Sequence, residues 1–559
     1  MVESNGDTQV LRPPRLRQFR ARPPRGAKRP WVILASVTLL AVIIQGFNLA
    51  ASRLWVQPDS AAYITLGAEL AEQSNFDHEL FHFRPPGYPL LLAGIFRVSG
   101  DTAAAVIPVI QHAMIVACAI LVTLIAWTLW PHRGFALAVG LPAACSWHLA
   151  GYASGVLTEV PYAFALIACV YGVVHHHRRG GLWSIAIASL AAAIAALIQP
   201  AGVFLLAFCV LTALTRAIRR RRDTDDPPDE PTPIRDPGHA RSHRRRRIVA
   251  LALAVAPAAV VVLPVLYHHY RVHGDFRVCS AGGYLYRRTA CIDHLDSHAS
   301  PAMAAVRQTL AQARRVGLLR PPDATVHDFW PTVTAYRLIH GVTFADAAAA
   351  MDRAGFDLLL ENPWSTARRT AAYAYRVLIT PDTAYRYRPG GAPGIGALPA
   401  KGVDLFDVDT YRPLVTADVG TERMNRYLPE NHDHAPASVP WNKVARWYHA
   451  HIELGPSLTA LLESPYEELA WLALLGGVFA LARPDRAAWL LVAGVIACHV
   501  VVSALWLGPW PRGAVPAQPL MLVFTGLFIV GLPHTLARGL RSLAHTLTRR
   551  STPQPAPRP

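Results

Sequence analysis

Charged residues are scarce in this sequence. Only 16% of the 559 residues are Asp, Glu, Lys or Arg, whereas 52% are hydrophobic, a balance typical of membrane proteins. Basic residues exceed acidic ones and give a formal charge of +17, yet neither zinc-ligand spacing nor an aromatic RNA-binding motif accompanies them. The basic residues lie mainly next to apolar runs, where they orient helices and contact anionic lipid. No nucleic-acid partner is therefore predicted.

Nucleotide and metal motifs are also missing. The sequence has no Gly-rich phosphate-binding loop between a strand and a helix, so no nucleotide site is predicted. His268, His269, His273 and Asp275 lie close together, but their spacing does not match the helical histidine pair of zinc hydrolases. No metal ligand is assigned, and a requirement for a divalent cation stays open.

Cysteine is infrequent, with seven residues in the chain. Five of them fall in apolar runs, where small thiols are ordinary packing residues. Cys279 and Cys291 instead flank a turn expected outside the cytoplasm. An oxidising compartment would allow a disulfide between them, and unfavourable geometry would equally forbid it.

Apolar runs of about twenty residues, the length needed to cross a bilayer, recur along the chain. They predict roughly ten transmembrane helices, near residues 31–50, 104–130, 134–150, 156–175, 182–198, 201–217, 248–270, 466–482, 487–507 and 514–535. The first run follows a basic tail and is long enough to remain as an anchor rather than a cleaved signal peptide. Basic residues crowd alternate connecting segments, which places both termini in the cytoplasm.

This topology predicts an all-α polytopic membrane protein with a mixed, partly helical extracytoplasmic domain. Its segments are a cytoplasmic basic tail (1–30), a transmembrane catalytic module of seven helices (31–270) with a first outer loop (51–103) and a disordered cytoplasmic loop (218–247), the extracytoplasmic domain (271–465), the C-terminal transmembrane helices (466–535) and a cytoplasmic tail (536–559). Helical apolar spacing and several aromatic residues in 271–465 indicate an ordered domain. Alanine-, arginine- and proline-rich usage favours a bacterial plasma membrane.

The first outer loop supplies a carboxylate just beyond the first span. Asp59 is followed by Tyr63 at i+4, so a helix would place both on one face. Asp59 is a candidate general base. Alternatively it caps the helix that follows Pro58.

Two further charges are expected at the same membrane side. Arg84 precedes a double proline and Tyr88, and its guanidinium suits a lipid phosphate or serves as an ordinary interfacial anchor. Glu159 begins the fourth span; it is either a site residue or a favourable charge at a helix N-terminus. Arg512, before the last span, is a second candidate for the phosphate or another anchor.

The segments that carry these residues resemble, in this order, the C-type glycosyltransferases. The resemblance is to the bacterial branch related to dolichyl-phosphate-mannose protein mannosyltransferases (glycosyltransferase family 39) and lipid A aminoarabinose transferases. It rests on Asp59 with Tyr63, Arg84-Pro-Pro before Tyr88, Leu157-Thr158-Glu159, the exit from Tyr270 to Phe276 with Gly282-Gly283, and Arg512. The chain departs from the family at Gln199-Pro200, at His268-His269-Tyr270 and at Arg512-Gly513.

The resemblance implies transfer of a sugar from a polyprenyl-phosphate donor to an extracytoplasmic protein, lipid or cell-wall glycan acceptor, with inversion. It implies Asp59 as general base, Glu159 as a second catalytic residue, and Arg84 and Arg512 on the donor phosphate. Substrate contacts are expected from Tyr63, Tyr88, His268, Tyr270 and Arg271.

The alternative is a lipid or glycan transporter. Against it, the sequence indicates neither paired interrupted helices in matching halves nor ionisable residues at mid-span. A membrane scaffold is a third option, and it would not depend on Asp59 or Glu159.

Overall fold

The computed structural model describes a helical protein at residues 30–51, 54, 58–74, 76–78, 80–225, 237–274, 276, 278–279, 283–319, 325–379, 465–483, 485–507 and 511–551. No strand occurs among these residues. The basic tail before residue 30 and the part of the expected outer domain at 380–464 lie outside them. The all-α fold class predicted from the sequence is confirmed for the described chain.

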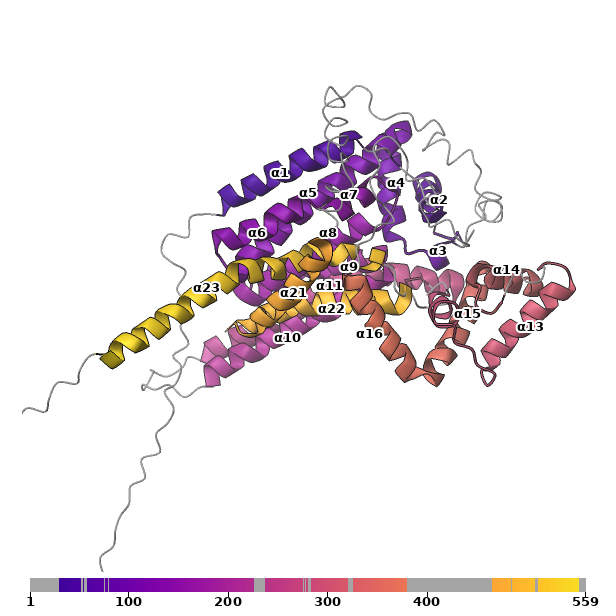
Figure 1. Ribbon diagram of the computed structural model, residues 1–559. Helices are drawn as coiled ribbons and strands as arrows, with labels where there is room; N and C mark the ends of the chain where they lie inside the picture. The colour runs from indigo at the N-terminus through magenta and orange to yellow at the C-terminus, as the bar shows by residue number, and fades with distance from the viewer. Residues whose placement is uncertain are drawn as a thin grey trace, which may run out of the picture.

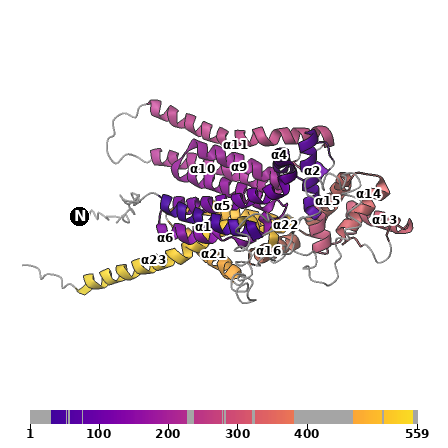
Figure 2. The same ribbon diagram turned by 90° about the horizontal axis from the view of Figure 1, so that it is seen from above.

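Long helices form one bundle, and shorter helices gather at one of its ends (Figures 1 and 2). The N-terminal half contains α1 (Trp31–Ala51), α2 (Pro58–Gln73), α3 (Leu80–Phe83), α4 (Gly87–Ser99), η1 (Gly100–Thr102), α5 (Ala103–Leu129), α6 (Arg133–Ala144), α7 (Trp147–Ala153), α8 (Glu159–Arg179), α9 (Leu182–Ile198), η2 (Pro200–Val203) and α10 (Phe204–Asp225). The remainder contains α11 (Pro237–His273), α12 (Tyr284–Tyr286), η3 (Arg287–Ile292), α13 (Pro301–Arg315), α14 (Phe329–His340), α15 (Phe344–Glu361), α16 (Pro363–Ile379), α21 (Pro465–Leu481), α22 (Arg486–Leu507), η5 (Pro511–Ala517) and α23 (Gln518–Ser551).

Six helical stretches in the described chain are long and apolar enough to cross a bilayer, and they establish a membrane protein. They are Trp31–Ala50, Gly87–Leu129, Glu159–Arg179, Arg245–Val272, Arg486–Leu505 and Ala514–Ala537. Four shorter apolar helices accompany them, at Arg133–Ala144, Leu182–Ile198, Pro200–Arg216 and Leu469–Leu481. Each of the ten predicted runs thus coincides with an apolar helix, although only six reach full spanning length.

The helix boundaries differ from the predicted spans in three places. The run at 134–150 is divided, because α6 ends soon after Pro142 and α7 begins at Trp147. The first outer loop contains α2 and the apolar helix α4. Helix also covers 218–225 and 237–247 of the loop for which disorder was predicted, and 226–236 lies outside the described residues.

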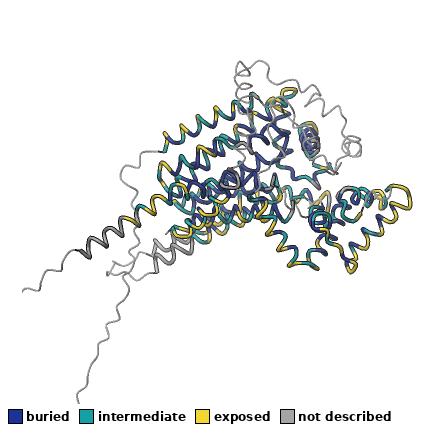
Figure 3. The backbone as a smooth tube through the Cα atoms, viewed as in Figure 1, coloured by how far each residue is buried: buried dark blue, intermediate teal, exposed yellow. Residues whose placement is uncertain are grey.

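Helix α8 lies at the centre of the bundle. It packs on α5, α9, α10 and α22, and its buried positions surround the helix, as Figure 3 shows for the middle of the bundle. Small residues allow the close contacts: a Cβ added to Gly172 would lie 2.6 Å from the carbonyl oxygen of Ser184 on α9. By contrast α11 is largely exposed on the bundle surface, where lipid would cover its apolar side chains.

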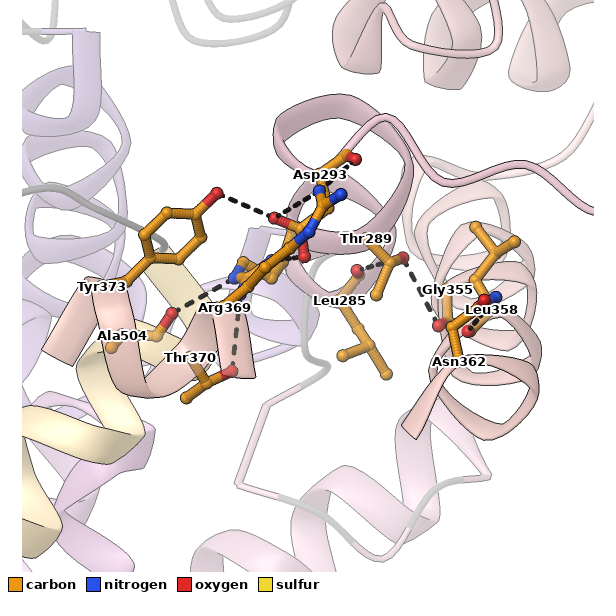
Figure 4. A network of polar contacts seen from close by, with 11 residues as sticks. Leu285, Thr289, Asp293, Gly355, Leu358, Asn362, Arg369, Thr370, Tyr373 and Ala504 are labelled. Carbon is orange, nitrogen blue, oxygen red and sulfur yellow. Dashed lines mark hydrogen bonds and ion pairs between the residues drawn. The ribbon is translucent and has the colours of Figure 1, made fainter. Parts of the chain in front are cut away.

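Helices α12–α15 and η3 enclose a second, smaller core at one end of the bundle. Buried Arg288 of η3 joins this core to the bundle, because it pairs with Asp293 and its Nε donates to the carbonyl of Ala504 on α22 at 3.3 Å. Figure 4 shows Tyr373 of α16 approaching the same carboxylate, with its hydroxyl 3.0 Å from Oδ1 of Asp293. Burial lowers the pKa of Arg288 to about 10, so the guanidinium is charged at neutral pH and requires its carboxylate.

Asp293→Ala should strongly destabilise the protein, because Arg288 would remain buried without its counter-ion. The expected cost is about 3–5 kcal/mol, measured as a lower thermal midpoint in detergent. Asp296→Ala is the matched control: its ion pair with Arg307, at 2.6 Å, is partly exposed and should contribute about 0–1 kcal/mol. Equal midpoints for the two variants would show that the buried pair does not hold this junction.

Candidate functional site

The structure brings Asp59 and Arg84 into direct contact. Nη2 of Arg84 donates to Oδ1 of Asp59 at 2.6 Å. The two side chains differ in access, since that of Arg84 is 12% exposed and that of Asp59 is 37% exposed. Asp59 lies in the first turn of α2, and Arg84 lies just before α4. The contact therefore joins two segments of the first outer loop at the end of the bundle where α12–α15 lie (Figure 1).

Two buried tyrosines extend this pair inward. The guanidinium of Arg84 lies over the ring of Tyr63, 5.2 Å from its centroid, a cation–π contact. Tyr63 in turn meets the ring of Tyr88 edge-on at 5.3 Å. Burial raises the pKa of Tyr63 to about 12, against the opposing effect of Arg84. Its phenol is therefore neutral at physiological pH.

The groups around Arg84 favour its charged form over its neutral form. Burial opposes the charge, but the attraction of Asp59, with Tyr63 and Tyr284, raises the pKa of the guanidinium above its ordinary value. Tyr284 begins α12, so the helices of the smaller core contribute to the electrostatics around Arg84. The sequence pointed only to the neighbouring Gly282-Gly283 turn and did not identify Tyr284.

The sequence around Arg84 determines how closely this segment approaches the bundle. Pro85 and Pro86 precede α4, which begins at Gly87, and the fixed φ of proline suits the start of a helix. A Cβ added to Gly87 would lie 2.6 Å from the carbonyl carbon of Leu197 at the end of α9. Glycine at this position therefore allows backbone contact between the loop that carries Arg84 and the bundle.

Glu159 is buried, with 3% exposure, in the first turn of α8. A carboxylate there is stabilised by the helix dipole. Its charge acts on both Tyr63 and Tyr88, so it belongs to the same electrostatic cluster as Arg84. We refer to Asp59, Tyr63, Arg84, Tyr88 and Glu159 as the outer cluster.

Two glutamine amides, one buried (Gln111) and one partly buried (Gln199), hold the segment that leads into Glu159. Nε2 of Gln111 donates to the carbonyls of Ala153 and Gly155 at 3.1 and 2.8 Å. Nε2 of Gln199 donates to the hydroxyl of Thr158 at 2.9 Å. These contacts satisfy polar groups within the membrane bundle and fix the start of α8. The sequence named Gln199 only as a departure from the family pattern and did not identify Gln111.

Three residues predicted to contact substrate lie near the end of α11. His268 faces Asp77, with Nε2 and Oδ1 3.5 Å apart. Tyr270 is exposed, and Arg271 donates to the hydroxyl of Tyr267 at 3.3 Å on the surface of α11. Their substrate role stays a prediction. Arg512 lies within η5, and its side chain is outside the described residues.

Ionisable side chains do occur at mid-span, which corrects one sequence-based argument against transport. His499 of α22 is buried, and its Nδ1 lies 3.3 Å from the hydroxyl of Tyr162 on α8. His112 of α5 is also buried, 2.8 Å from Oε1 of Gln45 on α1. Both histidines can be identified in the printed sequence within the predicted spans. Each makes a hydrogen bond between helices, which accounts for its burial.

No group of three or more His, Cys, Asp or Glu side chains that could hold a metal ion is found within the described part of the chain. Asp275 lies outside that part. Cys279 and Cys291 are not joined by a disulfide. Burial raises the pKa of the Cys291 thiol to about 12, so this thiol is protonated at neutral pH.

Comparison with known proteins gives structural neighbours only. No family model matches the sequence, and no curated protein matches it. The archaeal oligosaccharyltransferase AglB from Archaeoglobus fulgidus, solved with an inhibitory peptide and a dolichol-phosphate, aligns over 94% of this chain with 12% identity and a TM-score of 0.41. ArnT from Cupriavidus metallidurans, bound to undecaprenyl phosphate, aligns over 89% with 14% identity and a TM-score of 0.33.

This chain spans about half of AglB (52%) and 76% of ArnT. Both neighbours are C-type glycosyltransferases, the superfamily that the sequence motifs resemble. Because both TM-scores are below 0.5, the alignments do not match individual side chains of this chain with those of AglB or ArnT. Roles for the outer cluster are therefore argued from its own residues.

Gly87→Ala should disturb the position of Arg84, because the added methyl group would meet the backbone of Leu197. The expected cost is about 1–3 kcal/mol, as for other overpacked sites, measured as a fall in thermal midpoint. Gly94→Ala on the same helix is the control, since no atom lies within 4 Å of its added Cβ; it should be neutral or stabilise the helix by up to about 1 kcal/mol. Unchanged stability in Gly87→Ala would rule out the backbone contact.

Proposed function

We propose that this protein is a membrane glycosyltransferase that moves a sugar from a polyprenyl phosphate to a hydroxyl of an extracytoplasmic acceptor. The observation that carries the proposal is the Asp59–Arg84 contact: an accessible carboxylate beside a partly buried, permanently charged guanidinium at one end of an apolar bundle. A base and a phosphate-binding cation are the two groups that such a transfer requires.

The orientation of the bundle agrees with this assignment. At the end opposite the outer cluster, Arg178 pairs with Asp485, and Nη1 of Arg216 donates to the carbonyl of His176 at 2.6 Å. Basic side chains favour the cytoplasmic face. We therefore infer that the outer cluster faces away from the cytoplasm, with both termini inside a plasma membrane.

The reaction assigns one role to each member of the pair. The acceptor oxygen attacks the anomeric carbon while the bond from that carbon to the phosphate oxygen breaks, with inversion. The hydroxyl proton passes to the carboxylate of Asp59, and the bonding electrons leave with the lipid phosphate. Arg84 stabilises the charge that develops on this leaving group, and Arg512 is proposed as a second phosphate contact.

The remaining outer-cluster residues shape the site. Tyr63 and Tyr88 form an aromatic wall beneath Arg84, and Glu159 is proposed to hold the acceptor or to tune Asp59. The donor lipid would lie in the bilayer, and the acceptor would be a protein, lipid or cell-wall glycan reached from the outer domain. This scheme assigns no resident cofactor, and dependence on a divalent cation is tested by adding a chelator to the assay below.

Asp59→Asn should reduce transfer by at least about 100-fold, since a positioned general base contributes roughly 10²–10⁴-fold. The assay uses membranes containing either protein, a panel of radiolabelled polyprenyl-phosphate sugars and endogenous acceptors. Asp101→Asn is the control, because Asp101 is an exposed acid at the same end of the bundle; its activity should equal that of the wild type.

Full activity in Asp59→Asn would remove this residue from the mechanism. Transfer from no donor, in correctly inserted wild type, would favour the alternative of lipid or glycan transport. The buried His499–Tyr162 contact between α22 and α8 would then be the first site to test for proton coupling.

A further inference from the structure

Asp59 and Arg84 contact each other, although the proposed reaction gives them separate roles. Asp59 is the proposed base, and Arg84 is the proposed phosphate contact. The 2.6 Å contact between Arg84 and Asp59 uses the guanidinium nitrogen Nη2. One face of the guanidinium is covered by the ring of Tyr63, and the Arg84 side chain is only 12% exposed. Asp59 is the more exposed partner, at 37%. An anion that replaces Asp59 on Nη2 of Arg84 would therefore occupy the place where the carboxylate now lies.

This contact opposes both proton acceptance by Asp59 and phosphate binding by Arg84. A carboxylate that accepts a hydrogen bond from an arginine at this distance takes up a proton less readily. An arginine already neutralised by a carboxylate binds a phosphate less tightly, because the first pair must be broken. The arrangement therefore represents a resting state rather than the reacting state.

We propose that the Asp59–Arg84 pair is a latch that the phosphate of the donor opens. The phosphate displaces the carboxylate from Arg84, and Asp59 becomes available as a base only when a donor is bound. This inference rests on the proposed function and adds an order of events to it. The donor binds first, and the acceptor hydroxyl is deprotonated afterwards.

The surroundings of each group permit this exchange. Arg84 is held by burial and by the Tyr63 ring, so it remains in place when its partner changes. Asp59 lies in the first turn of α2, where the helix dipole favours a carboxylate without Arg84. The phosphodiester of the donor carries the same single negative charge as a carboxylate and likewise offers two oxygens to a guanidinium, so it can compete for the same donor edge.

The test is equilibrium binding of undecaprenyl phosphate to the full-length protein in lipid nanodiscs. Asp59→Asn should bind it at least about tenfold more tightly than the wild type, because no carboxylate has to be displaced. Arg84→Ala should lose most of the binding. The double variant should match Arg84→Ala, since the gain requires the arginine. Asp101→Asn should match the wild type, and undecaprenol, which lacks the phosphate, should bind all variants equally.

Thermal midpoints give a second readout that does not depend on activity. Asp59→Asn should have a lower midpoint than the wild type, because Arg84 loses its carboxylate. Saturating undecaprenyl phosphate should raise the midpoint of Asp59→Asn by more than that of the wild type.

The outcomes separate this inference from the proposed function. Equal or weaker phosphate binding by Asp59→Asn, together with loss of binding in Arg84→Ala, would overturn the latch and retain Arg84 as a donor contact. Absence of undecaprenyl phosphate binding in the wild type and in Asp59→Asn would overturn the donor site itself. Tighter binding in Asp59→Asn that persists in the double variant would also overturn the latch, because the gain would not involve Arg84.

Discussion

The cost of placing charge in a bilayer divides this chain into an apolar bundle and two charged ends. A buried charge is tolerated only when it is paired and hydrogen-bonded, and the described arginines follow this constraint. At one end Arg178 pairs with Asp485, and Arg216 donates to backbone carbonyls of α8. At the other end Arg84 pairs with Asp59, and Arg288 pairs with Asp293. Every larger feature of the fold is compatible with this separation.

The two ion pairs at the outer end differ in a way that assigns them different tasks. Arg288 and Asp293 have no solvent-exposed side-chain surface, and the pair also contacts α16 and α22. Such a pair stabilises one arrangement of domain and bundle and leaves no access for a ligand. The Asp59–Arg84 pair is open on the carboxylate side. This exposure is compatible with the proposed exchange of the carboxylate for a phosphate, whereas the fully buried pair can only serve the structure.

Much of the fold could be predicted from the sequence, because bilayer crossing leaves a strong signal in hydropathy. The run predicted at 182–198 matches α9 at both ends, and the first span is displaced by one residue at its C-terminal end. The lengths of the helices were harder to predict than their positions in the sequence. The single span expected at 134–150 is broken between α6 and α7, since a helix-breaking proline near a polar Cys145-Ser146 step does not lower the mean hydropathy of the whole run.

Pairing between residues could not be predicted in the same way. Asp59 and Arg84 were each predicted by residue type and by membrane side, but their contact depends on how closely α2 packs on α4, where a Cβ added to Gly67 would lie 2.8 Å from Cβ of Leu92. The Arg288–Asp293 pair was missed because nothing in a stretch of ordinary polar residues indicates complete burial. His499 shows that a histidine within an apolar run is itself a signal of a polar contact between helices.

The one family departure that the structure explains is Gln199. Its amide donates to Thr158, the residue before Glu159, across the contact between α9 and α8. Glutamine therefore holds the start of α8, where Glu159 lies, by a neutral hydrogen bond and adds no charge beside that carboxylate.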